Sequence, residues 1–240
     1  MSTTIVCPSG LSVVVRGMKG RELKVLSNVA ALKSGEFIDQ IFDACVESVI
    51  DPGPYDLTPD GKLNWNDVLV GDRIYVSVRV RVETFGDEFA FNARCGTCGK
   101  KEEYAFNLTS LEVKELSTED RAAFKAGPLK TAFPGTGAEV KFRLATGSDE
   151  KWIAKTSNNK DAAVMDMLAR RIVSIEGADR PKAFLEEASL GDVMTLLKEM
   201  NKRDCGVETS VALTCPDATC EATSEINIPI GSLRPFWIPK

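Results

Sequence analysis

Four cysteines occur as two closely spaced pairs, and thiolates at such spacings are common metal ligands. In the segment CGTCG, two residues separate Cys95 from Cys98, so both sulfurs can face one ion while the glycines let the chain turn. In CPDATC, four residues separate Cys215 from Cys220. Together the pairs supply four sulfur ligands, the number that a tetrahedral Zn²⁺ site requires. The sequence therefore predicts one structural zinc ion bound by all four cysteines.

A site closed by four thiolates has no open position for water or substrate, so the predicted ion stabilises the fold and does not catalyse a reaction. Two alternatives remain for these cysteines: unligated thiols, or a redox dithiol at CGTC. A redox CxxC normally opens a helix whose dipole lowers the thiol pKa, whereas this one is predicted between strands. Zinc is the favoured interpretation. Cys7, Cys45 and Cys205 are interpreted as ordinary thiols, with Cys45 on the apolar face of a helix.

Composition restricts the classes of function. The chain has 240 residues, 43% of them hydrophobic, which is enough for a large core. It contains no histidine, so the commonest general base and the Ser-His and Cys-His nucleophile pairs are missing. No phosphate-binding loop, EF-hand loop or nucleophile elbow occurs in the sequence. We therefore expect a protein that is not an enzyme.

Charge disfavours nucleic acid as a partner, since the net charge is -5 and the pI is about 5.1. The basic stretch from Arg73 to Arg81 and the pair Lys100-Lys101 are predicted to be solvated, because acidic residues lie close by. In the alternative, a zinc-ribbon nucleic-acid binder, these residues would contact phosphates and binding would weaken with salt. No apolar run is long enough to span a membrane, and the start lacks a secretory signal.

A weak internal repeat places the two cysteine pairs at equivalent positions. SVVVRG, ending at Gly17, resembles KFRLATG, ending at Gly147, with a shift of 130 residues. Gly71-Asp72 matches Gly191-Asp192 with a shift of 120, which continues from Cys95 to Cys215 and becomes 122 at Cys98 and Cys220. Between these anchors, two segments with helical spacing match at a shift of 126: Ile38, Ile41, Phe42, Cys45, Val46 and Val49 with Val164, Met167, Leu168, Arg171, Ile172 and Ile175.

Each half is predicted to contain a strand, two helices, a third helix after Gly-Asp, and a β-hairpin with the cysteines at its tip. Residues 74–82 alternate like a strand, but the matching stretch VMTLLKEMNKR has helical spacing, so a helix is favoured. The predicted fold is α+β, with internally duplicated, pseudo-two-fold helical units whose β-hairpins close a shared zinc-ribbon-like site. The predicted parts are a first repeat over 1–118, a Pro/Gly-containing linker over 119–138, and a second repeat over 139–240.

The last residues, LRPFWIPK, contain a cluster formed by Phe236, Trp237 and Ile238. A terminal aromatic cluster either packs on the protein's own core or inserts into a partner. Packing on the core is favoured here.

Several segments in order resemble the baseplate hub assembly proteins of contractile-tailed, T-even-like bacteriophages. They are CPSG, VVVRGMKGRELKVLSN, LKSGEFIDQIFDACV, VGDRIYVSVRVRVETFGDEF, CGTCG and NLTSLEVKEL, and they fall mainly within residues 7–116. Positions that fit the family pattern are Gly71, Asp72, Arg73, Gly86, Cys95 and Cys98. The CxxxxC spacing of Cys215 and Cys220 departs from a plain CxxC, which bears on the completeness of the metal site.

The resemblance implies a structural or assembly role in the hub region of a tail baseplate, without enzymatic activity. The implied partners are other phage tail and baseplate proteins, together with further copies of the chain as a homo-oligomer within the assembly. The implied locations are the host cytoplasm during assembly and the baseplate of the virion tail.

Overall fold

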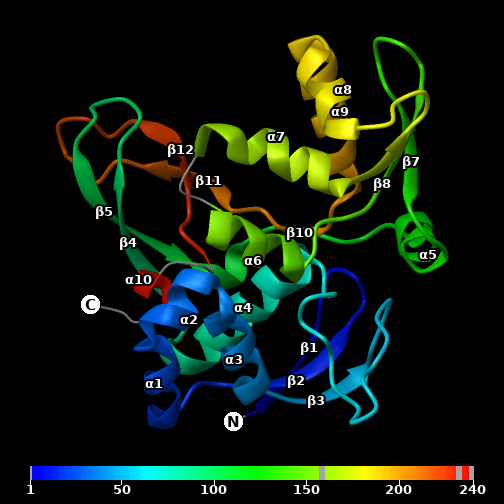
Figure 1. Cartoon of the computed structure of the whole chain (residues 1–240). Helices are drawn as coiled ribbons and strands as arrows, with labels where there is room; N and C mark the ends of the chain where they lie inside the picture. Colours follow the sequence, from blue (N-terminus) through cyan, green and yellow to red (C-terminus); the bar gives the residue numbers. More distant parts are fainter. Residues whose placement is uncertain (1, 157–159, 231–233, 238–240) are drawn as a thin grey trace.

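The structure is a computed structural model that describes residues 2–156, 160–230 and 234–237. Helices and short antiparallel sheets alternate along the chain, so the fold is α+β (Figure 1). Within the described part of the chain, no helix is both long and apolar enough to cross a membrane.

The first sheet has the strand order β1-β2-β3, with β1 at Ser2–Val6, β2 at Ser12–Arg16 and β3 at Val46–Asp51. Between β2 and β3 the chain forms a short 3-10 helix and three α-helices: η1 (Gly20–Glu22), α1 (Leu23–Leu26), α2 (Val29–Ser34) and α3 (Glu36–Cys45). The apolar residues of α3, spaced at three and four residues, are buried. They pack with Val13 and Val15 of β2, which are fully buried, in the core.

The predicted helical segments are shorter than their apolar spacing suggested. The prediction that Val46 and Val49 continue the helix was wrong, because α3 ends at Cys45 and Val46 is already extended at the start of β3. The same occurs in the second half, where α7 (Lys160–Arg171) is followed directly by β9 (Ile172–Ile175). Both strands are rich in β-branched residues, which pack well on a pleated sheet.

The helix α4 (Val70–Phe85) confirms the favoured interpretation of residues 74–82. Its valines alternate as in a strand, yet Val76, Val78 and Val80 are all at least 96% buried in the helix. Because the core covers α4 on most sides, this helix needs no single apolar stripe.

The prediction that the basic stretch is solvated was wrong for two of its three arginines. Arg73 and Arg81 are 1% and 3% exposed. Arg81 donates from Nε to the carbonyl oxygen of Phe236 at 3.0 Å, and its guanidinium lies over the ring of Phe89, 4.7 Å from the centroid. The planar, weakly hydrated guanidinium allows such burial when carbonyl oxygens and aromatic faces surround it.

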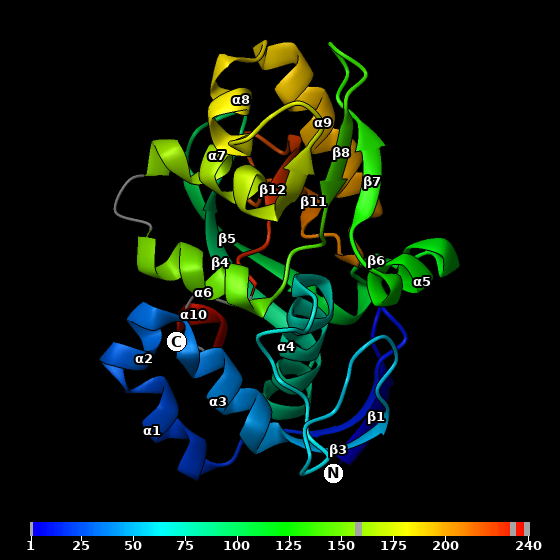
Figure 2. The same ribbon diagram turned by 45° about the vertical axis from the view of Figure 1, so that its right-hand side comes forward.

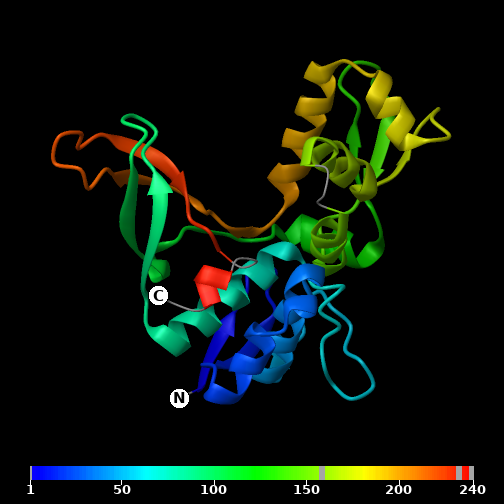
Figure 3. The ribbon, with the colours of Figure 1, turned by 60° about the vertical axis from the view of Figure 1, so that its left-hand side comes forward.

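Two hairpins carry the cysteine pairs, as predicted. β4 (Glu88–Arg94) pairs with β5 (Lys101–Asn107), and β11 (Ser210–Thr214) pairs with β12 (Thr223–Asn227). Figure 3 shows the two hairpins side by side at one end of the molecule, away from the lobe that contains α8 (Pro181–Glu187) and α9 (Leu190–Arg203).

The segment 119–138, predicted as a linker, contains regular structure. After β5 come η2 (Leu108–Ser110), β6 (Val113–Lys114), α5 (Thr118–Ala126) and β7 (Leu129–Ala132). β7 pairs with β8 (Glu139–Phe142), and β8 pairs with β9, which gives a second three-stranded sheet with the order β7-β8-β9. The segment is therefore partly built into the second sheet.

Contacts between the halves run through α6 (Gly147–Thr156) and β10 (Gly206–Val207). Figure 2 shows α6 between α7 and the helices α2 and α3 of the first half, and α6 also contacts α4. β10 pairs with β6 and packs on α4. Two segments of the second half therefore cover the first-half helices.

The C-terminal helix α10 (Arg234–Trp237) packs on the first half of the chain, as the favoured interpretation of the aromatic cluster predicted. Phe236 and Trp237 are fully buried, and the ring of Phe236 meets that of Phe89 edge-on at 5.5 Å. Ile238, the third member of the predicted cluster, lies outside the described residues.

Gly71 in the first turn of α4 is expected to resist substitution. A Cβ atom there would lie 2.1 Å from the carbonyl oxygen of Cys205, whereas at Gly191, in the same place on α9, the nearest atom is the Ser189 Oγ at 3.9 Å. We expect Gly71→Ala to lower the free energy of unfolding by about 1–3 kcal/mol through overpacking. Gly191→Ala should raise it by up to about 1 kcal/mol through helix propensity. Urea denaturation of both variants checks this, and equal effects would contradict the close approach.

Candidate metal centre

The cysteine pairs lie in the turns of the two hairpins, and each turn is closed by an equivalent backbone hydrogen bond. The N–H of Cys95 donates to the carbonyl oxygen of Lys100 at 2.9 Å, and the N–H of Cys215 donates to that of Ala222 at 3.0 Å. Cys98 and Cys220 lie inside these turns. Each hairpin therefore presents its two thiols from one short loop.

The structure brings the four predicted cysteines together. The Sγ atoms of Cys95 and Cys220 are 3.9 Å apart, as are those of Cys98 and Cys215, and all four sulfurs lie within 4.8 Å of one another. A tetrahedron with zinc–sulfur bonds of 2.3 Å has sulfur–sulfur edges of about 3.8 Å. The donor type and the spacing of the sulfurs therefore fit a four-coordinate Zn²⁺ ion, and each close contact joins one hairpin to the other.

Burial of the thiols differs around the centre. Cys95 and Cys215 are 2% and 3% exposed, Cys220 is half-buried, and Cys98 is exposed. The first cysteine of each pair therefore faces the protein, and the second lies nearer the solvent. A bound ion would be sheltered on the side of the two strands that lead into the turns.

Local electrostatics favour a thiolate at Cys95. Backbone N–H groups of Cys98 and Thr97 lower the pKa of Cys95 to about 6, and the Thr97 nitrogen lies 3.4 Å from its sulfur. For Cys98, the backbone N–H of Lys100 lowers the pKa, but burial and the neighbouring cysteines raise it to about 11 overall. Four sulfurs this close repel one another when ionised, so uptake of a cation would be accompanied by release of protons.

An ion pair links the two turns beside the sulfurs. Lys100 of the first turn pairs with Asp217 of the second. The Asp217 carboxylate also accepts hydrogen bonds from the backbone and side chain of Thr219, at 2.8 and 2.7 Å. The hydrogen bond from Lys100, followed by those from Thr219, lowers the pKa of Asp217. Lys100 thus adds a positive charge beside a cluster that becomes anionic when its thiols ionise.

The other three cysteines lie elsewhere in the core. Cys7, Cys45 and Cys205 are buried, and burial raises the pKa of each thiol, to about 11 for Cys45. Among the described residues, the four hairpin cysteines form the one cluster of three or more potential ligands that could hold a metal.

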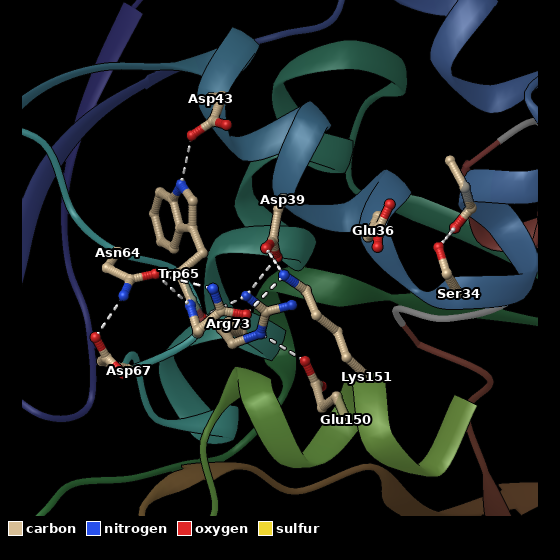
Figure 4. Close-up of polar contacts among 12 residues, drawn as sticks. Ser34, Glu36, Asp39, Asp43, Asn64, Trp65, Asp67, Arg73, Glu150 and Lys151 are labelled. Carbon is tan, nitrogen blue, oxygen red and sulfur yellow. Dashed lines mark hydrogen bonds and ion pairs between the residues drawn. The ribbon is translucent and has the colours of Figure 1, made fainter. Parts of the chain in front are cut away.

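A second polar centre, which sequence reasoning did not find, lies between the halves around Arg73 (Figure 4). Arg73 of α4 donates from Nη1 to Asp39 of α3 at 2.7 Å and from Nε to Glu150 of α6 at 2.5 Å. Its Nη1 also donates to the carbonyl oxygen of Trp65, and Lys151 pairs with Asp39. Positive and negative side chains alternate in this centre, and each charge is paired with one of opposite sign. The ion pairs therefore join α3, α4 and α6.

The neighbouring Asp72 is fully buried in a separate set of hydrogen bonds. Its carboxylate accepts from the backbone N–H of Ser9 at 2.9 Å, from the Ser9 hydroxyl, and from the Tyr55 hydroxyl at 2.6 Å. Burial raises the pKa of Asp72, against the lowering effect of these bonds. The sequence signal was the Gly71-Asp72-Arg73 segment, in which two adjacent charged residues bind different sets of partners.

Comparison with known proteins adds one match. The model of a family described as T4 bacteriophage base plate protein matches residues 1–230 of the chain. Neither curated proteins nor solved structures gave a match.

Proposed function

Because the chain belongs to the T4 bacteriophage base plate protein family, we propose that it is a structural or assembly component of the hub region of a tail baseplate, stabilised by one zinc ion and without enzymatic activity. The family supports a structural role, and the proposed partners are other tail and baseplate proteins. The observation that carries the zinc proposal is the four-sulfur cluster, with its edges of 3.9 Å between hairpins of opposite halves.

A zinc ion at this cluster would join the two hairpins, whose turns are also linked by the Lys100–Asp217 ion pair. Its four thiolate ligands, Cys95, Cys98, Cys215 and Cys220, would leave no open coordination position, as in structural zinc sites. An acidic Cys95 fits both a dithiol and a metal ligand, but CGTC lies in a hairpin turn, whereas a redox CxxC normally opens a helix. The dithiol alternative is weaker because each close sulfur contact joins this turn to the second hairpin.

One zinc ion per chain is the expected metal content. Elemental analysis of full-length protein purified without added metal, at neutral pH and under reducing conditions, measures it directly. Zinc at one equivalent supports the shared site, because the four sulfurs form a single cluster. A value near zero would contradict the metal site and leave the thiol alternatives, and two equivalents would contradict sharing between the hairpins.

We further propose that the chain arose by duplication of one unit, and sheet register supports this. In the first sheet Val13 pairs with Val49, Val14 with Ser48 and Val15 with Val46, so the register skips residue 47. In the second, Val140 pairs with Ile175, Lys141 with Ser174 and Phe142 with Ile172, which skips residue 173. The outer strands differ by 126 residues (175 - 49 = 126) and the central strands by 127 (140 - 13 = 127), so one of the two irregularities of the first sheet recurs in the second.

The strand register also changes two details of the sequence alignment. The central strands correspond at a shift of 127, so SVVVRG and KFRLATG at a shift of 130 are out of register by three residues. The second unit would begin near β7, which pairs with β8 as β1 pairs with β2, and α5 would then belong to the connection. A duplicated chain has two similar but unequal surfaces, which suits contacts between rings of different symmetry in a baseplate.

Analysis of phage particles tests the role in the baseplate. Quantitative mass spectrometry of purified tails should detect the chain at a fixed ratio to other baseplate proteins if it is a built-in component. If it acts only during assembly, infection with a phage lacking the gene should yield no complete baseplates, while wild-type particles lack the chain. Normal baseplates formed without the gene would refute both versions.

A further inference from the structure

The hydroxyl of Tyr104 is buried without an ordinary hydrogen-bond partner. Tyr104 lies on β5, is 3% exposed, and stacks on its cross-strand neighbour Phe91 with 6.1 Å between ring centroids. Among the described residues, no atom accepts a hydrogen bond from its oxygen. A buried hydroxyl without a hydrogen-bond partner destabilises the fold, so this unpaired group requires an explanation.

The thiols of Cys215 and Cys95 are close neighbours of this hydroxyl. A phenol ordinarily has a pKa of about 10, so Tyr104 keeps its proton at neutral pH and can donate it. A protonated thiol is a weak acceptor, whereas a metal-bound thiolate carries negative charge and is a much better one. The hydroxyl thus lies close to atoms that become strong acceptors when a metal ion is bound.

We propose that Tyr104 donates a hydrogen bond to the thiolate of Cys215 in the metal-bound centre and thereby orients this ligand. The inference rests on the proposed four-cysteine metal site. It assigns Tyr104 a positioning role that crosses between the halves, because the donor belongs to the first hairpin and the acceptor to the second.

The charge of the centre explains why such a donor is useful. Four thiolates around one Zn²⁺ leave a net charge of -2, which hydrogen-bond donors stabilise. Cys95 has the backbone N–H of Thr97 at 3.4 Å. Cys215 is as deeply buried as Cys95, so water has little access to its sulfur. The backbone N–H of Asp217 is one donor beside this sulfur, and the Tyr104 hydroxyl would be a second. Donors to metal ligands typically change metal affinity by 10- to 100-fold.

Tyr104→Phe in the full-length chain tests the inference, because it removes the oxygen and keeps the ring that stacks on Phe91. Tyr75→Phe, the same substitution on α4, is the matched control. Zinc affinity is measured by competition with a chelator, and the Co²⁺-substituted proteins are compared by absorption spectroscopy. The pH at which half of the metal is released is measured for all three proteins.

We expect Tyr104→Phe to weaken zinc binding by about 10- to 100-fold. Loss of the donor makes the sulfur more electron-rich, so the sulfur-to-cobalt charge-transfer band should move to longer wavelength. The thiolate also becomes more basic, so metal should be released at higher pH. A variant with lower stability but the wild-type spectrum and release pH would overturn the donor role.

The outcomes separate this inference from the metal site itself. If the wild-type chain binds no Zn²⁺ or Co²⁺, the metal site is wrong and the donor has no acceptor. If the wild type binds and Tyr104→Phe matches both the wild type and Tyr75→Phe in affinity, spectrum and release pH, only the role of Tyr104 is refuted.

Discussion

Cys215→Ser is expected to release the hairpin of the other half of the molecule. Cys215 belongs to the second hairpin, yet its loss would leave an ion bound by three thiolates and break the link to β4–β5. Structural zinc contributes on the order of 10 kcal/mol in zinc-finger peptides, comparable to the whole stability of a typical domain. Cys95→Ser should therefore have a matching effect on β11–β12, since both cysteines bind one ion in the proposed site.

Hydrogen exchange followed by mass spectrometry measures this reciprocal effect on each hairpin. A local loss of about 3 kcal/mol corresponds to roughly hundredfold faster exchange of the affected amides. Cys205→Ser is the matched control, because Cys205 is buried outside the cluster and its loss should leave one zinc per chain. If either ligand variant disturbs its own hairpin alone, the two cysteine pairs do not share an ion.

Arg73→Met is expected to lower the free energy of unfolding by about 3–5 kcal/mol, the cost of breaking a buried ion pair from one side. The substitution keeps much of the side-chain volume but leaves the Asp39 and Glu150 carboxylates with Lys151 as their shared cation. For a chain of this length, the loss corresponds to a fall of about 6–20 °C in the melting temperature. Scanning calorimetry measures it.

The pH dependence of this effect distinguishes electrostatics from packing. Burial raises the pKa of Glu150, and Arg73 acts against this by favouring the ionised form. Without Arg73 the pKa of Glu150 should rise further, so the folded variant takes up a proton as the pH falls. The difference in stability between wild type and variant should therefore shrink as the pH is lowered through the pKa of Glu150.

Arg79→Met on the same helix is the control for Arg73. Arg79 is partly exposed, and its nearest ion pair is a 3.9 Å contact with Glu83. Its loss should cost less than about 1 kcal/mol. Equal effects of the two substitutions, or a cost at Arg73 that does not vary with pH, would contradict the interpretation of this centre as a buried ionic link between the halves.

Local spacing made the cysteine hairpins predictable. Three signals could be read without tertiary structure: the two residues between Cys95 and Cys98, the alternation of apolar and polar residues in the flanking strands, and the repeat that leads to Cys215. The helix at residues 74–82 was recovered only through its counterpart in the second half. Its own valines alternate because a helix surrounded by core has no polar face to mark its period.

The errors arose where distant contacts decide the structure. The apolar spacing of α3 continues into Val46 and Val49, and only pairing with β2 makes that stretch a strand. Arg73 looked solvated because its neighbours in sequence are charged, whereas its partner Glu150 lies 77 residues away. Tyr104 looks like any strand residue in EEYAFNL, since nothing in that segment shows which sulfurs lie close to its hydroxyl.

The four-cysteine cluster between the hairpins can form only after both hairpins have been synthesised. Cys98 leaves the ribosome 122 residues before Cys220 (220 - 98 = 122), which at 5–20 residues per second is about 6–24 seconds. During that interval only two of the four cysteines of the proposed site have been synthesised, and Phe236 has not yet covered Phe89 and Arg81. A chain truncated before Cys215 would therefore lack two of the four clustered cysteines and would leave Phe89 and Arg81 without the cover of α10.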